Sequence, residues 1–152
     1  MTEQSILQQM VHALRAEFFE YQNLNTLSEK QLDLLADSNP NVEQIARVMD
    51  HKIKLVETIN NLEANHKEIK SQWETDYTLF SPEEKEEIAQ LKESLLRTIE
   101  QLQEMENQIE QGIKKCETEL NQQLHAIQKG RSANQAYFKY DQGPPRYIDK
   151  KK

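Results

Sequence analysis

Glu63 and His66 are the residues of this chain whose types and spacing come nearest to a metal site. A glutamate three positions before a histidine places a carboxylate and an imidazole on one side of a helix, which is half of the signature of di-iron bundles. A complete site needs a second such pair and two more inward-facing glutamates. The residues three positions before the other histidines are Gln9, Val48 and Gln122. We therefore predict no metal, and we expect His66 at the edge of an apolar core.

Cys116 is the single cysteine of the chain. One cysteine excludes an internal disulfide and a cysteine-based metal cluster. It lies among the regularly spaced apolar residues of a predicted helix, which favours a small buried hydrophobe over a reactive thiol. The sequence contains neither a glycine-rich phosphate loop nor a nucleophile elbow. We therefore expect no catalytic residue, no cofactor and no enzymatic activity.

Residues 131–152 combine aromatic with basic side chains. They carry a net charge of +4, whereas the rest of the chain carries −11. An acidic body argues against nucleic acid as a partner, because phosphate binding requires clustered positive charge. This tail can pack on the acidic body of its own chain or dock on another protein. Its aromatic residues are Tyr137, Phe138, Tyr140 and Tyr147.

The composition is typical of one domain made of long helices. The 152 residues include only three glycines and four prolines, and 30% of them are charged with mixed sign. A secretory signal would require a short apolar run after a charged start, and the sequence shows none. No stretch approaches the roughly 20 apolar residues that span a membrane. We expect a soluble, cytoplasmic protein.

Three stretches repeat apolar residues at steps of three and four, which predicts amphipathic helices over residues 4–36, 42–79 and 82–129. Pro40 ends the first stretch, and Asn39 or Asn41 can cap the second. Ser81 and Glu84 form a capping box for the third, with Pro82 at its first position. Gly130 is a natural end for that helix.

Short connections between long helices favour antiparallel neighbours. We therefore predict an all-α chain in which residues 1–130 form an up-down-up bundle of three long helices. Residues 131–152 form a basic aromatic tail, with a short helix from Ser132 or irregular structure. The third helix is too long for its partners, so its C-terminal apolar seam should overhang and bind a partner. The predicted partner-binding residues are Ile113, Cys116, Leu120, Leu124, Ile127, Tyr137, Phe138 and Tyr140.

Three stretches of the sequence resemble the FlgN/FliT group of flagellar type III export chaperones. The first is Leu27 to Leu35, and the second is residues 45–62, with the run MDHKIKLVETINNLE. The third is the end of the last predicted helix, LHAIQKGRSANQAYFKY, followed by PRYIDKKK. The resemblance implies a small acidic helical protein that binds a late export substrate, such as a hook–filament junction or filament-cap protein. It also implies delivery of that client to the export gate, with no catalytic residue.

A structural role is the alternative function. A spectrin-like spacer or a self-associating coiled coil would use the same long seam to form a homodimer. Light scattering over a range of concentrations separates the two, because an assembly role predicts a permanent oligomer. In the chaperone interpretation, we expect the tail to compete with the client for the acidic, partly apolar end of the rod.

Overall fold

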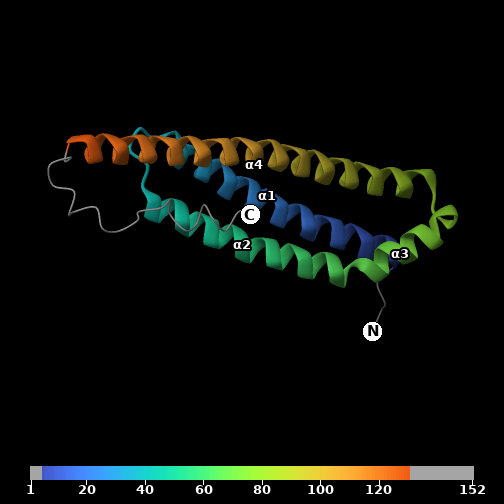
Figure 1. The fold of residues 1–152 in the computed structure, drawn as a ribbon. Helices are drawn as coiled ribbons and strands as arrows, with labels where there is room; N and C mark the ends of the chain where they lie inside the picture. Colours follow the sequence, from blue (N-terminus) through green and yellow to red (C-terminus); the bar gives the residue numbers. More distant parts are fainter. Residues whose placement is uncertain (1–4, 131–152) are drawn as a thin grey trace.

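The computed structural model describes residues 5–130, and all of its regular structure in that range is helical. The prediction of an all-α chain is confirmed for these residues, while the predictions for residues 131–152 lie outside them. Figure 1 shows the order of the elements. They are α1 (Ile6–Ala36), α2 (Val42–Asn65), α3 (Lys67–Thr75), the short 3₁₀ helix η1 (Tyr77–Leu79) and α4 (Pro82–Gly130).

Side-chain caps define where three of the helices begin. Ser5 and Gln8 form a capping box at α1, and the Asn41 side chain accepts a hydrogen bond from the Gln44 N–H at α2. At α4 the Ser81 hydroxyl accepts from the Glu84 N–H at 3.1 Å, and the Glu84 carboxylate accepts from the Ser81 N–H at 2.8 Å. These bonds satisfy backbone donors that a helix start leaves unpaired, so the sequence fixes these boundaries locally.

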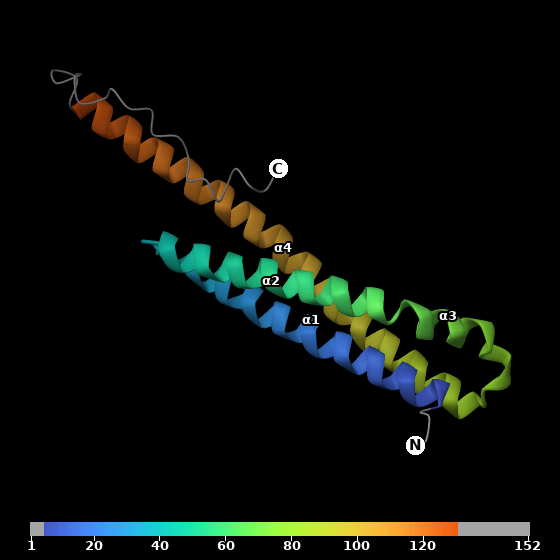
Figure 2. The ribbon, with the colours of Figure 1, turned by 90° about the horizontal axis from the view of Figure 1, so that it is seen from below.

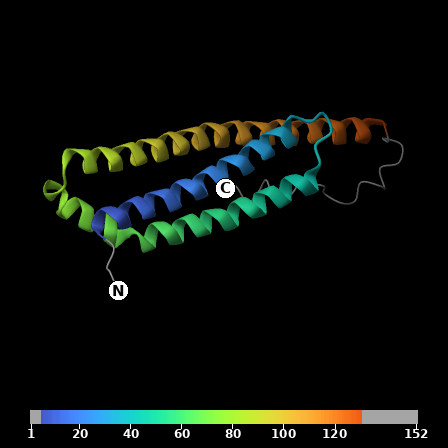
Figure 3. The same ribbon diagram turned by 180° about the vertical axis from the view of Figure 1, so that it is seen from behind.

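The chain forms a rod in which α1 lies between the other long helices. It runs along the rod in α1, returns in α2 and α3, and runs along it again in α4 (Figures 1 and 3). The face of α1 packs against both α2 and α4. The backbones of α2 and α4 approach each other at few points, and both views show them apart along most of the rod. The two outer helices are therefore joined mainly through α1.

The prediction of one continuous helix over residues 42–79 is wrong: the chain breaks that helix at His66, and α3 ends at Thr75, before η1. No proline or glycine lies at the break, and the His66 N–H still bonds the Leu62 carbonyl at 2.9 Å. The side chains of His66 and Lys70 both reach Glu17 of α1, at 2.7 and 2.8 Å. We attribute the break to this tertiary contact, since the local sequence favours a continuous helix.

The segment after the break closes one end of the rod. Trp73 of α3 is fully buried against Met10, Leu14 and Ile88, so residues from α1, α3 and α4 form this core together. Its ring stacks on Phe80 with centroids 4.2 Å apart. Tyr77 and Leu79 of η1 remain exposed at the same end.

At the other end, α4 continues beyond its neighbours (Figure 2). α1 ends at Ala36, and its last turn lies against Gly112, where an added Cβ would come within 3.2 Å of Leu35 Cδ1. Ile113 and Cys116 are still buried, at 2% and 9% exposure. Leu120, Leu124 and Ile127 lie on the continuation of α4, and their side chains are outside the described part. The overhang therefore starts after Cys116.

Replacing Glu17 with alanine should lower the free energy of unfolding by about 2–4 kcal/mol, because it removes a buried acceptor from two partly buried donors, His66 and Lys70. Urea denaturation followed by far-ultraviolet circular dichroism measures the change. Glu29→Ala, an exposed change on the same helix, should alter stability by less than about 0.5 kcal/mol. Equal effects of the two substitutions would show that the Glu17 contacts do not hold α3 in place.

Candidate helix-binding groove

An apolar groove of about 400 Å³ lies between α2 and α4. Leu24 of α1 forms its floor, and Leu102 lines it from α4. Its α2 wall exposes apolar side chains, with Ile53 51% and Val56 41% exposed. The full lining is Leu24, Gln31, Met49, Lys52, Ile53, Val56, Glu57, Leu102 and Glu106.

The spacing of apolar residues along α2 explains why its wall is uncovered. Ile45, Val48 and Ile59 are buried and hold α2 against the rod. Met49 and Ile53 fall on the neighbouring face, because each residue turns an α-helix by about 100°. That face would be covered only if α4 came closer to α2, and the two backbones stay apart. α2 therefore has a wider apolar face than α1 alone can bury.

A polar cluster crosses the groove and links all three long helices. Lys52 of α2 donates to Gln31 Oε1 of α1 at 2.9 Å and pairs with Glu106 of α4. Ser28 of α1 donates to Glu106 Oε1 at 3.2 Å. Gln31 and Ser28 are fully buried. Partly buried ion pairs of this kind add little net stability, but they are costly to break and so favour one register of the helices.

A second polar cluster lies toward α3. Glu17 accepts from both His66 Nδ1 and Lys70 Nζ, and Tyr21 donates to Glu63 Oε1 at 3.0 Å. Burial raises the pKa of Tyr21 to about 12, and the Glu63 carboxylate adds to the effect. Tyr21 therefore remains a protonated donor near neutral pH. His66 and Glu63, the pair with metal-site spacing, are each used in a separate hydrogen bond to α1.

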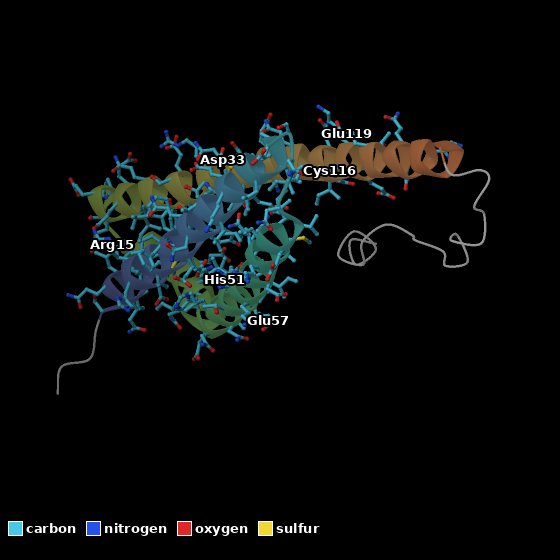
Figure 4. The ribbon with its side chains drawn as sticks, turned by 90° about the vertical axis from the view of Figure 1, so that its left-hand side faces the viewer. Arg15, Asp33, His51, Glu57, Cys116 and Glu119 are labelled. Atoms are coloured by element: carbon cyan, nitrogen blue, oxygen red, sulfur yellow. The ribbon has the colours of Figure 1, made fainter. Side chains whose placement is uncertain are left out.

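The described residues offer no arrangement suited to metal binding. Within residues 5–130, no three side chains of His, Cys, Asp or Glu come together as a group that could hold a metal ion. The histidines His12 and His66 line a polar hollow of about 450 Å³ between α1 and α3, beside Glu68. His51 lies exposed on α2 (Figure 4) and does not line this hollow.

The structure divides the predicted partner-binding residues into three sets. Ile113 and Cys116 belong to the core that the chain forms by itself, so we correct their assignment to an open seam. The side chains of Leu120, Leu124 and Ile127 are not described. The remaining three, Tyr137, Phe138 and Tyr140, lie outside the described residues.

Sequence reasoning missed the groove residues on α2. The apolar periodicity assigns Met49, Ile53 and Val56 to a core face, and it does not show that their side of α2 stays uncovered. A signal exists in the width of that face, since α2 carries adjacent apolar residues at Val48 and Met49 and again at Leu55 and Val56, and adjacent residues lie about 100° apart around a helix. One neighbouring helix covers a narrower stripe than this.

Comparison of the chain with models of protein families, with curated proteins and with solved structures gave no match. In the part of the chain that the structure describes, every helix is too short or too polar to cross a membrane.

Cys116 should react slowly with a thiol reagent in the folded protein. Figure 4 shows it on α4, where it is 9% exposed. Burial raises the pKa of its thiol, and the Glu119 carboxylate raises it further, against a smaller effect of Lys115. Reaction with Ellman's reagent at pH 8 should be at least about tenfold slower than in denaturant, because both access and the thiolate fraction are reduced. Equal rates would place Cys116 at the surface and restore it as a partner contact.

Proposed function

We propose that this chain is a non-enzymatic binding protein that holds an amphipathic helix of another protein in the groove between α2 and α4. The rod would then be an antiparallel up-down-up bundle of three long helices, to which the bound helix adds a fourth. The observation that carries the proposal is the exposure of Ile53 and Val56 along a groove with an apolar floor. Helix-in-groove binding uses such a surface, with anchors at every third or fourth position.

The energetics of the groove suit reversible binding. Full burial of a valine or isoleucine side chain is worth about 1.5–3 kcal/mol, and roughly half of each remains to be gained at these two positions. Met49 and Leu102 add partly buried surface. Several anchors contribute about 1 kcal/mol each, and the loss of translational and conformational freedom on association offsets part of this gain. The remaining affinity is modest, so the bound helix can also be released.

The resemblance to the FlgN/FliT group suggests what the bound helix is. We infer that the client is the helical terminus of a flagellar export substrate, such as a hook–filament junction or filament-cap protein. The chain would keep the apolar face of this helix out of water in the cytoplasm and deliver it to the export gate. The chemistry that this requires is exclusion of water without covalent catalysis.

Replacing Ile53 and Val56 together with aspartate should weaken binding of such a client helix by at least about tenfold, because carboxylates would replace two anchors. A labelled client peptide titrated with full-length protein gives the affinity. Phe19→Asp with Leu96→Asp is the matched control, since these residues are 61% and 55% exposed on other faces. Similar losses in both double variants would mean that the groove is not the binding site.

Self-association through the overhang of α4 is the second candidate function, and the extension of α4 past α1 favours it (Figure 2). Replacing Leu120 and Leu124 together with aspartate should then convert a dimer to a monomer with little change in melting temperature. Light scattering over a range of concentrations provides the measurement. A large fall in melting temperature would place both residues in the core, and a chain that is monomeric from the start would exclude this function.

A further inference from the structure

Two carboxylates border the apolar groove, and the described part of the chain supplies only some of the hydrogen-bond donors that they can accept from. Glu106 accepts from Ser28 and from Lys52, and both bonds go to Oε1. Within residues 5–130, its Oε2 receives no hydrogen bond. Glu57 lies at the exposed α2 rim (Figure 4), and no hydrogen bond or ion pair reaches its side chain from the described part of the chain.

The groove lining contains one cationic side chain, and that side chain already bonds to other residues of the chain. Lys52 is held between Gln31 and Glu106, and its side chain is only 12% exposed. Its ammonium group is fixed by those contacts with α1 and α4. The lining therefore combines one ammonium with two carboxylates, and the excess charge is negative.

Covering the groove changes the surroundings of these carboxylates. A helix seated over Ile53 and Val56 removes water from Glu57 beside them and from Glu106 on the opposite wall. A carboxylate that loses water without gaining a donor destabilises the complex, whereas a charge-assisted hydrogen bond from arginine or lysine stabilises it. An occupant with acidic residues at the borders of its apolar face would be repelled.

We propose that the occupant of the groove is an amphipathic helix of another protein that carries arginine or lysine at the borders of its apolar face, where Glu57 and Glu106 bind it. This inference rests on the proposed function and adds the chemistry by which the client is selected. A second copy of residues 1–130 is disfavoured as the occupant because that region carries −11.

Two synthetic peptides test the inference. Both are 20-residue helices with the same leucine and alanine face; one has arginine at both borders of its middle turn and the other has glutamate there. Fluorescence anisotropy is measured with full-length wild-type protein, with Glu57→Lys, and with Glu29→Lys. Glu29→Lys makes the same charge change at an exposed α1 position outside the groove.

We expect wild-type protein and Glu29→Lys to prefer the arginine peptide by about tenfold, and Glu57→Lys to abolish or reverse that preference. Circular dichroism of each variant confirms that the helices are retained. If the Glu57→Lys variant were unfolded, the binding of both peptides to wild-type protein would be measured at increasing salt concentration in place of that variant. Salt should then remove the preference for arginine while leaving the affinity for the leucine face.

Equal binding of both peptides, or a preference that Glu57→Lys leaves unchanged, would overturn the inference while leaving the proposed function intact. Binding of neither peptide would reject the groove as a helix site and the proposed function with it. A carbodiimide cross-link from Glu57 to a lysine of residues 150–152 within a monomer would assign the groove to the chain's own tail. A dimer that Glu57→Lys dissociates would assign it to a second copy. Both of these outcomes overturn the inference.

Discussion

The inner face of α1 carries three fully buried polar side chains, and each of them requires a partner on a different helix. Glu17 is matched by His66 and Lys70 at the α2–α3 break, Ser28 by Glu106 of α4, and Gln31 by Lys52 of α2. Apolar contacts alone tolerate sliding, because one leucine replaces another a heptad away. A shift by one turn would leave these polar groups buried without partners, at a cost of about 1–3 kcal/mol each. The relative positions of all the helices follow from this requirement.

The same requirement explains which parts of the fold can be predicted from the sequence. The start of α4 depends on Ser81 and Glu84, which lie three residues apart and interact with each other. Such boundaries are local, and periodicity with capping chemistry identifies them. The break at His66 depends on Glu17, 49 positions earlier, and no local pattern in residues 62–70 indicates it. A contact between distant residues overrides helix propensity there.

The candidate site was harder to predict than the fold, for a related reason. Periodicity shows that Val56 and Ile113 each lie on an apolar face, but burial depends on which neighbour covers that face. Ile113 is buried next to Gly112, where the last turn of α1 meets α4, whereas Val56 faces the space between two helices that stay apart. Of the seam that the sequence predicts on α4, Ile113 and Cys116 are buried by the chain itself, while the side chains of Leu120, Leu124 and Ile127 lie outside the described part. The seam that the described residues leave open lies on α2.

The overhang of α4 has a consequence for the entropy of association. An isolated helix shorter than about 12–15 residues is marginal in water, because forming its first turn fixes several residues for one hydrogen bond. Residues 117–130 continue a helix whose earlier turns are already held by packing as far as Cys116. The nucleation step has therefore been completed inside the bundle, and each further residue needs only propagation. A partner that meets this end of α4 finds backbone that is already helical, so less conformational freedom is lost on contact than with an unfolded segment of the same length.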